Sequence, residues 1–233
     1  RHLLAFLALA SSTFAQVPNS LTNAVARYRL AADAIDSARG NNGTIFGSPA
    51  FTGGSPVTGN AVRFTANTQS ISASSTPAVA SLSNNFAVSL WMKMAVYNPS
   101  AASTVAQKVT VGTNGWMVWV GEASAPTNLV FFTYGTSPNN QSSLGYTVPL
   151  NRWVFIVCQL TGSRSQTWAN GRLVRDVAIT GSATTNTQPF IIGNYAGVGD
   201  SFKGQLCDVN IYPYSLSPQT IGWLYTFKPY GAQ

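Results

Sequence analysis

Histidine is almost absent from this chain of 233 residues, and the only one is His2. Catalytic triads of the Ser-His-Asp type and Cys-His nucleophiles need an imidazole as general base, and many zinc sites use histidine as a ligand. A histidine that lies so close to the start of the chain is a poor candidate for either role. The sequence therefore argues against these nucleophilic hydrolases and against histidine-based zinc sites.

Acidic residues are scarce as well, and none lies in a close cluster of carboxylates. The six are Asp33, Asp36, Glu122, Asp176, Asp200 and Asp208. Hydrolysis of a glycosidic bond ordinarily needs two carboxylates that face each other across the scissile bond. Glycine-rich fingerprints for phosphate or dinucleotides are also missing. The sequence predicts a protein that is not an enzyme.

Only two cysteines are present, Cys158 and Cys207, and each lies in a run that reads as a β-strand. A disulfide between them requires neighbouring strands whose side chains point toward each other, which the sequence does not establish. The pair is predicted either as one disulfide, as suits an oxidising compartment, or as two buried free thiols.

Charged residues make up only 8% of the chain, about a third of the usual share. The net charge of +7 comes from Lys and Arg residues that are scattered along the sequence. Segments that bind nucleic acid concentrate their basic residues, so nucleic acid is not an expected partner. Scattered residues such as Arg172 and Arg175 could attract an acidic polysaccharide, or they could simply keep the protein soluble.

Long hydrophobic runs are missing, and no stretch is long and apolar enough to span a bilayer. The opening run RHLLAFLALASSTFAQ has a basic beginning, a short apolar middle and small residues near its end, which is typical of a secretory signal peptide. We expect a signal peptide over residues 1–15 and a secreted or cell-surface protein, with a retained N-terminal segment as the alternative. Residues 16–233 are predicted to form one domain.

What the sequence does contain is a series of short β-branched and aromatic stretches, separated by Gly, Asn and Pro every ~8–12 residues. The stretch 85–96, NFAVSLWMKMAV, is the longest of them and is expected to be central. Asn170-Gly171 predicts a type I′ hairpin turn, because both residues accept a positive φ. The pattern is typical of an all-β protein, an antiparallel two-sheet jelly-roll sandwich.

Only residues 215–225 indicate a helix. Ser217 is placed to cap its N-terminus, and Pro218 suits the first helical position. Ile221 and Leu224 would form one apolar stripe. This short C-terminal helix is expected to pack against the sandwich.

Several of these stretches match the pattern of a known family. They run from DSARGNNGTIFG through NFAVSLWMKM, RWVFIVCQL, TWANGRLV and FIIGN to FKGQLCDVNIYPYSLSPQTIGWLY, roughly residues 25–226. In order and spacing the series resembles the laminin G-like, concanavalin A-like jelly roll, the group that includes the pentraxins. The resemblance implies the fold, and it implies a glycan or protein partner near one rim. Such folds host many functions, so function has to be argued from a site.

The resemblance also bears on calcium, which the family often binds at one rim through oxygen ligands that include carboxylates. Where pentraxins have acidic ligands, this sequence offers Asn194 and Asn114. The remaining candidate ligands are Asp36 and Asn42 in the early loop, with Asp208 from the last strand. No other cofactor is expected.

A sugar-binding surface commonly stacks an aromatic ring on the sugar and surrounds it with amides and hydroxyls. Tyr195, in the glycine-rich loop GNYAGVGD, is the first candidate for that ring. Its candidate polar neighbours are Asn194, Asn114 and Asp200. Trp168, beside the hairpin, is a further aromatic candidate whose alternative role is packing.

Trp116 and Trp119 are three residues apart in the sequence. In a regular strand they therefore point to opposite faces, and at least one of them belongs to the core.

Asn42 and Asn140 each begin an Asn-X-Ser/Thr sequon in loop-like sequence. Both are candidate N-glycosylation sites.

Two functions remain. The first is a secreted, non-catalytic module that binds an extracellular glycan or polysaccharide or acts in adhesion. The second is a structural subunit of an extracellular filament, sheath or coat that polymerises with copies of itself. The low charge and the abundance of Ser, Thr and Asn suit the second reading.

Overall fold

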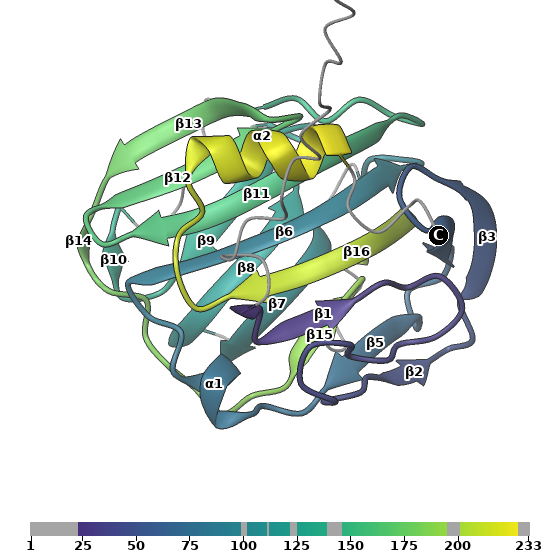
Figure 1. The fold of residues 1–233 in the computed structure, drawn as a ribbon, viewed down its shortest axis with the longest axis horizontal. Helices are drawn as coiled ribbons and strands as arrows, with labels where there is room; N and C mark the ends of the chain where they lie inside the picture. Colours follow the sequence, from purple (N-terminus) through teal and green to yellow (C-terminus); the bar gives the residue numbers. More distant parts are fainter. Residues whose placement is uncertain are drawn as a thin grey trace, which may run out of the picture.

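The computed structural model describes residues 23–98, 102–110, 112–121, 125–138, 146–194 and 201–227. Strands dominate these residues and form two large antiparallel sheets with two short helices (Figure 1), so the expected all-β sandwich is confirmed. The predicted signal peptide, Asn140, Tyr195 and Asp200 lie outside the described residues. Neither described helix has the length and apolar character needed to cross a membrane.

The larger sheet has eight strands. They are β1 (Ala26–Tyr28), β3 (Ala50–Ser55), β4 (Gly59–Phe64), β6 (Asn85–Met94), β11 (Trp153–Thr161), β12 (Arg164–Ala169), β13 (Arg172–Ala178) and β16 (Gly204–Tyr212). Their order is β13-β12-β11-β6-β16-β4-β3, which makes β6 central as predicted. On its other edge, β16 pairs with β4 along its first half and with β1 along its second half.

The smaller sheet has six strands in the order β2-β5-β15-β7-β8-β9. They are β2 (Thr44–Phe46), β5 (Ser70–Ala73), β7 (Ser103–Thr110), β8 (Asn114–Val120), β9 (Leu129–Thr133) and β15 (Phe190–Ile192). A separate pair joins β10 (Thr136–Ser137) to β14 (Thr180–Gly181). The helices are α1 (Pro77–Ala80) and α2 (Pro218–Phe227).

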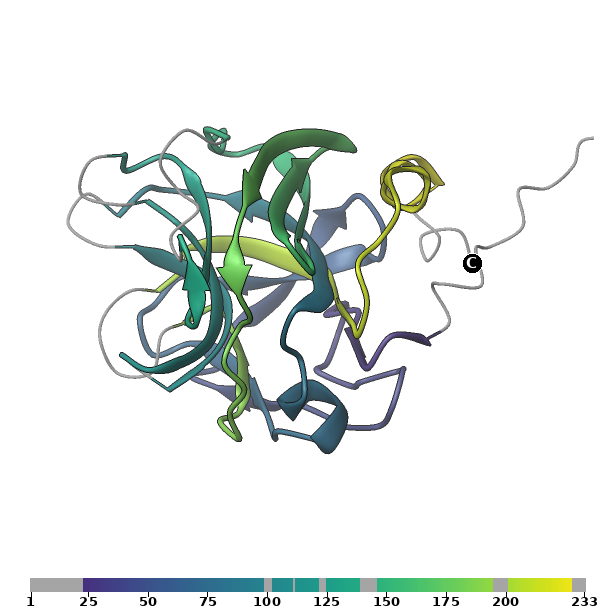
Figure 2. The same cartoon turned by 90° about the vertical axis from the view of Figure 1, so that its left-hand side faces the viewer.

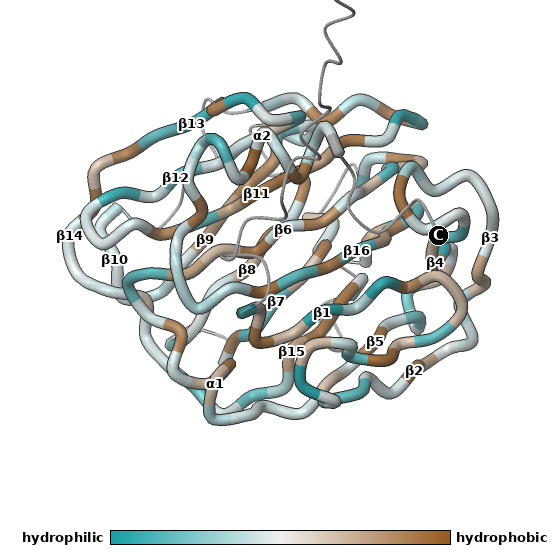
Figure 3. Tube along the Cα trace, viewed as in Figure 1, coloured by the Kyte–Doolittle hydropathy of each residue, from teal (hydrophilic) through white to brown (hydrophobic). Residues whose placement is uncertain are grey.

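The main core lies between the two sheets. Along β6, Val88 and Leu90 belong to this core, whereas Ala87 and Trp91 belong to a second apolar cluster on the opposite side of the larger sheet. Both sides of β6 are therefore buried, which explains its nearly continuous apolar sequence. Hydrophobic sections of the chain gather along β6, β11 and β16 (Figure 3).

The second cluster lies on the outer face of the larger sheet, the face turned away from the smaller sheet, and α2 covers it (Figure 2). Ser217 Oγ accepts a hydrogen bond from the Thr220 N–H at 3.1 Å, which confirms the predicted cap. Ile221 and Leu224 are buried beside Trp91 in this cluster. The predicted helix is present, although it begins and ends slightly later in the sequence than 215–225.

The turn between β12 and β13 is the predicted hairpin. The φ angle is 50° at Asn170 and 77° at Gly171, so both central residues have the positive values of a type I′ turn. Asn170 also ties the turn to β11. Its Oδ1 accepts a hydrogen bond from the Phe155 N–H at 3.0 Å, and its own N–H donates to Phe155 O at 2.8 Å.

Strand β16 begins and bends at two special positions. At Gly204, φ is 151° and a Cβ atom would lie 2.2 Å from Lys93 O, so only glycine lets the strand approach β6 so closely. A bulge interrupts the β16–β6 ladder between Cys207 and Asn210. Within it, Asp208 has a φ of 50°. The bulge falls where the other edge of β16 passes from β4 to β1.

The two cysteines are free thiols, so the predicted disulfide is not formed. Cys158 pairs with Val88 and Cys207 pairs with Trp91, which places β6 between the two cysteine strands. The side chains also point to opposite faces of the larger sheet, because Cys158 belongs to the main core and Cys207 to the cluster under α2. Two side chains so arranged cannot form a disulfide. The alternative of two buried thiols holds.

Two elements have weak signals in the sequence. The short helix α1 follows β5, and Thr76 caps it, with Oγ1 accepting a hydrogen bond from the Val79 N–H at 3.3 Å. Strand β3 contains Gly53 and Gly54, which are unusual inside strands. Its pairing with β4, rather than its own residue preferences, makes it a strand.

Candidate functional site

The predicted glycan site centred on Tyr195 is only partly within the described residues. Asn194, its neighbour, is buried and hydrogen-bonded at both ends of its side chain. Its Nδ2 donates to Asn67 O at 2.5 Å, and its Oδ1 accepts from Ser201 Oγ at 2.7 Å. Its main-chain oxygen accepts from Gln107 Nε2 at 3.1 Å. Asn194 therefore anchors the chain at the end of β15, with both ends of its side-chain amide bonded within the protein.

Asn114 lies at the start of β8 and is half-buried. It stands beside Gly115, whose carbonyl accepts from the Tyr134 N–H at 2.9 Å. The Tyr134 hydroxyl in turn accepts from the Gly112 N–H at 3.0 Å. The structure thus places Asn114 near an aromatic ring, but that ring is Tyr134.

Trp168 does not provide a surface for stacking. Its side chain is only 8% exposed and lies in the cluster under α2, together with Phe155 and Leu224. The burial of such a large apolar ring favours packing over recognition. The predicted role of Trp168 in glycan binding is therefore wrong, and the alternative role in packing is the observed one.

The first candidate calcium ligand, Asp36, is occupied by the backbone. Its Oδ1 accepts from the Arg27 and Ala38 N–H groups at 2.8 and 2.9 Å, and its Oδ2 accepts from the Asn41 N–H at 3.1 Å. The Oδ1 of Asn42 accepts from the N–H of Asp36 itself at 3.0 Å. Because donors already surround the carboxylate, Asp36 and Asn42 hold the loop after β1 in shape. Asn42 is exposed, as a glycosylated residue must be.

Asp208, the third candidate ligand, lies apart from this loop, in the bulge of β16. It is buried, and its Oδ1 has no hydrogen-bond partner. Burial raises the pKa of its carboxyl to about 6, while Asn210, Arg27 and Arg29 act in the opposite direction. Across the described part of the chain, no group of three or more His, Cys, Asp or Glu residues could hold a metal ion. Asp208 acts as a buried acid of the bulge, facing the arginines of the β1 segment.

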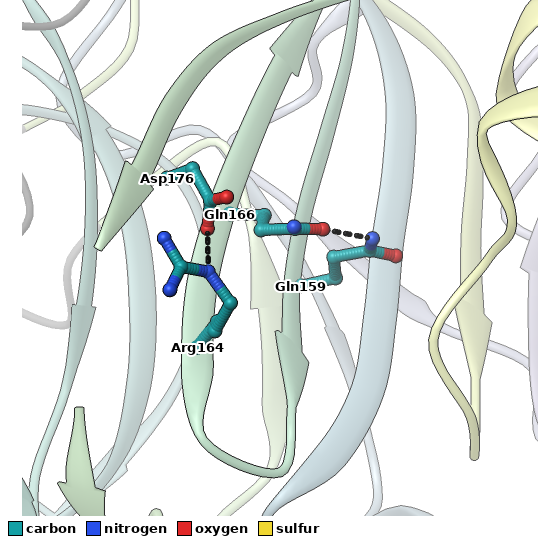
Figure 4. Close-up of polar contacts among 4 residues, drawn as sticks. All are labelled: Gln159, Arg164, Gln166 and Asp176. Carbon is teal, nitrogen blue, oxygen red and sulfur yellow. Dashed lines mark hydrogen bonds and ion pairs between the residues drawn. The ribbon is translucent and has the colours of Figure 1, made fainter. Parts of the chain in front are cut away.

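Another carboxylate is engaged on the outer face of the larger sheet, where strands β11 to β13 carry polar side chains (Figure 4). Arg164 Nε lies 2.6 Å from Asp176 Oδ1, and Gln159 Nε2 donates to Gln166 Oε1 at 2.8 Å. Gln159 Oε1 also accepts from the Leu216 N–H at 2.8 Å, which ties the segment before α2 to the sheet. These contacts stabilise the fold and leave Asp176 paired with an arginine.

A buried lysine, which the sequence reading did not single out, fastens the segment before β15. Lys108 Nζ donates to Asn186 O and Oδ1 at 2.7 and 2.8 Å and to Gln188 O at 2.9 Å. Burial lowers the pKa of this ammonium to about 8. Through these three hydrogen bonds, Lys108 links β7 to residues 186–188.

The remaining aromatic group lies on the outer face of the smaller sheet. Trp116 points into the main core, whereas Trp119 is half-buried on the opposite face, as their spacing predicted. Met117 on the same face of β8 pairs with Phe132 of β9, and Tyr134 follows Phe132 by two residues. We call the outward side chains of Met117, Trp119, Phe132 and Tyr134 the aromatic face.

The rings of the aromatic face touch one another. The Trp119 and Phe132 centroids are 5.4 Å apart, and the Phe132 and Tyr134 centroids are 4.7 Å apart with the rings at 79°. All three side chains are half-buried, so each combines a packed edge with exposed area. Such a row offers an apolar strip on which a flat ligand can lie.

Polar groups border this strip. Gln107 of β7 pairs with Met117 and therefore points to the same face. Its Nε2 is bonded to Asn194, but its Oε1 has no partner, and neither has Trp119 Nε1. The face thus combines stacking surface with one unsatisfied acceptor and one unsatisfied donor, both beneath the surface.

The sequence prediction placed the stacking ring at Tyr195 and did not include Phe132. The signal was available in NLVFFTYG, since Phe132 and Tyr134 differ by two and must share a face of the strand. What was not available was the pairing of β8 with β9, which brings Trp119 next to Phe132.

Comparisons with known proteins agree on the fold. Domain 4 of a GH43 extracellular arabinanase from Geobacillus stearothermophilus, solved in complex with arabinotriose, has a TM-score of 0.70 and 20% identity over 88% of this chain and 98% of that chain. The binding domain of Paraclostridial Mosquitocidal Protein 1 has a TM-score of 0.71 and 15% identity over 89% of this chain and 53% of that chain.

A further structure, of botulinum neurotoxin type C, comes from work on cell entry through two ganglioside molecules. It has a TM-score of 0.66 and 14% identity over 88% of this chain and 51% of that chain. This chain spans about half the length of both toxin structures. At these identities the likeness shows a shared fold. No curated protein matches the sequence.

The family comparison is direct, because a laminin G family model described as "Concanavalin A-like lectin/glucanases superfamily" matches residues 64–222, more than half of the chain. The matched span runs from the end of β4 into α2 and so includes most strands of both sheets. The sequence resemblance is thereby confirmed, and the chain belongs to the concanavalin A-like lectin/glucanase superfamily.

Proposed function

We propose that this protein is a non-catalytic glycan-binding module and that the aromatic face of the smaller sheet is its sugar-contacting surface. The observation that carries the proposal is the contiguous row of Trp119, Phe132 and Tyr134, half-buried on an outer sheet face. Membership of the concanavalin A-like lectin/glucanase superfamily, which includes lectins, is in keeping with a binding role.

The chemistry of this face suits a sugar. The C–H groups on one side of a sugar ring pack on aromatic rings, while its hydroxyls need donors and acceptors at the rim. The face offers Trp119, Phe132 and Tyr134 for stacking, with Gln107 Oε1 as a polar group beneath them. A hydroxyl can donate and accept, so it could satisfy the unpaired atoms of this face once it reaches them.

The proposal includes no catalysis. Asp36 accepts backbone N–H groups, Asp176 pairs with Arg164, and Asp208 is buried in the bulge of β16. These three carboxylates therefore have structural surroundings and do not face a common open cleft that would hold a glycosidic bond.

The choice of a first ligand follows from the structural neighbours. The arabinanase domain was solved in complex with arabinotriose, and the toxin structure comes from work on ganglioside interaction. Arabinotriose and other neutral oligosaccharides are thus suitable probes. We also propose that the protein acts outside the cell, as the signal-like opening sequence suggests. Assembly into a homopolymer stays a prediction of the sequence.

The test is titration calorimetry with arabinotriose and a panel of neutral oligosaccharides, followed by aromatic substitutions. Trp119→Ala and Phe132→Ala should weaken binding of the best ligand at least about tenfold, since each removes a stacking ring. Phe46→Ala is the matched control, because Phe46 is exposed on β2, at the other edge of the same sheet.

Circular dichroism of each variant would separate lost binding from lost fold. Failure of every neutral glycan to bind the intact protein would contradict the proposal. So would binding that survives both substitutions, or binding that Phe46→Ala weakens equally.

A further inference from the structure

A polar hollow of about 350 Å³ opens on the outer face of the larger sheet, away from the aromatic face. Its lining comes from four adjacent strands and two neighbouring loop positions. The lining residues are Thr52, Gly53, Arg63, Lys93, Ala95, Asn151, Gly204 and Gln205. Its size is at the lower end of the range for small-ligand pockets, roughly 300–1,000 Å³.

Three of these residues form one straight row across the sheet. Gln205 of β16 pairs with Arg63 of β4 on one side and with Lys93 of β6 on the other. Paired residues point to the same face, and neighbouring strands are about 4.8 Å apart. Val62 and Met92, next to the two cations in sequence, belong to the main core, so the cations themselves point outward. Arg63 and Lys93 thus flank Gln205 with about 10 Å between their backbones.

The walls of the hollow are held in place. On one side the tip of the β3–β4 hairpin folds over the sheet, because Trp153 Nε1 of β11 donates to Gly54 O at 2.6 Å and Ser55 Oγ lies 3.1 Å from Cys207 Sγ. Gln205 Nε2 donates to Thr52 Oγ1 at 2.7 Å. These contacts use the Nε2 end of the Gln205 side chain and leave its Oε1 as an acceptor at the centre of the row.

Gly204 is one of the lining residues, where β16 enters the sheet. A Cβ atom at this position would collide with Lys93 O. Glycine therefore lets β16 pack closely against β6 beside the hollow.

The charged residues that line the hollow are all positive. None of its lining residues is acidic, and the carboxylate of Asp176 is paired with Arg164 on strands at the far edge of the same sheet. Two cations in one polar hollow without a local carboxylate repel each other weakly and attract an anion.

We propose that this hollow binds the anionic group of an acidic oligosaccharide, with Arg63 and Lys93 on the anion and with Gln205 and Asn151 on sugar hydroxyls. Arginine and lysine bind carboxylates and sulfates through charge-assisted hydrogen bonds. The amides supply the donors and acceptors that hydroxyls require. The site is on the opposite side of the sandwich from the aromatic face, so it would act independently of neutral-glycan binding.

The test uses the intact chain and four probes at low ionic strength: an oligogalacturonate, a sulfated galactan oligosaccharide, inorganic sulfate and arabinotriose. The variant Arg63→Gln/Lys93→Gln removes both cations of the hollow. The variant Arg39→Gln/Arg172→Gln removes the same charge at two other exposed positions. Titration calorimetry and thermal unfolding are recorded for each protein.

We expect at least one acidic oligosaccharide to bind, and the hollow variant to weaken that binding about tenfold or more. The charge-matched variant should change it less than about twofold, and added salt should weaken it in the intact protein. The two acidic probes tell whether the carboxylate or the sulfate is preferred.

Three results would overturn the proposal: no binding of either acidic probe, equal losses in both double variants, or inorganic sulfate binding as tightly as the oligosaccharides. If arabinotriose still binds while the acidic probes fail, this inference is lost and the proposed function stands. The reverse result would retain the hollow and reject the aromatic face.

Discussion

The outer faces of the two sheets carry similar residues but have different surroundings. On the larger sheet, Trp91 and Phe155 lie under α2 and form a second apolar core. On the smaller sheet, Trp119, Phe132 and Tyr134 are half-buried and retain exposed area. The strand sequences around Trp91 and Trp119 look alike, so the residue types do not distinguish packing from recognition. The difference is made by α2, which covers the face that carries Trp91.

The largest expected effect tests this difference through stability. Leu224→Ala removes a buried side chain from the α2 contact and should lower the free energy of unfolding by about 2–4 kcal/mol. Phe132→Ala removes a half-buried ring, and we expect at most about half of that loss, in proportion to its smaller buried area. Urea unfolding of both variants gives the comparison. Equal losses would mean that the aromatic face is as much a core as the α2 cluster.

Asp208 is expected to make stability depend on pH. Its folded pKa of about 6 lies above the ordinary 3.8, so between these values the native state holds a proton that the unfolded state has lost. The stabilisation that the folded state gains from the protonated Asp208 carboxyl is complete below about pH 4 and is lost as the pH rises through 6. Asp208→Asn should therefore raise the free energy of unfolding at pH 8 by up to about 3 kcal/mol and remove this slope.

Urea titrations from pH 4 to 8, a range of about two units on either side of 6, would measure the effect. Arg27 and Arg29 are the opposing groups, since both favour the charged carboxyl. If they dominate, Asp208→Asn will instead destabilise the protein at pH 8, and the bulge must be described as an ion-paired site.

A smaller effect is expected from the cap of α2. Ser217→Ala removes the acceptor for the Thr220 N–H and should lower the free energy of unfolding by about 1 kcal/mol. Ser217→Asp restores an acceptor at the same place and should recover most of the loss. Urea unfolding of the three proteins measures this, and an unchanged Ser217→Ala protein would show that packing alone holds the helix.

The smallest effect is expected at the cysteines, one on each side of the larger sheet. Burial raises the pKa of both thiols to about 12, so neither should react with a thiol reagent at pH 8 until the protein unfolds. A reducing agent should leave the melting temperature unchanged. A clear drop would instead reveal a bond, which the intervening strand β6 does not permit.

Local features were readable from the sequence because they depend on few residues. The hairpin at Asn170 needs only the backbone freedom of two positions, and the cap at Ser217 needs one hydroxyl before a helical pattern. The series of strands was readable too, since each stretch carries its own periodicity. These features, in order, were enough for the superfamily.

Contacts across the chain were not readable. Cys158 and Cys207 looked suitable for a disulfide until the order of the strands placed β6 between them. Trp168 was a candidate for stacking on a sugar, but it is buried in the cluster that α2 covers. Asp36 and Asp208 looked like partners in a calcium site, but one binds backbone N–H groups in a loop and the other lies in a bulge. In each case the deciding neighbour is far away in sequence.

The sequence by itself determined the fold class, the hairpin, the capped helix and the scarcity of catalytic groups, because these follow from residue type and local spacing. Only the tertiary structure decided which aromatic residues remain exposed and which cations share a hollow. Trp119 meets Phe132, and Arg63 meets Gln205 and Lys93, through strand register. Register is a cooperative property of whole sheets, set by the burial of one face and not by any single residue.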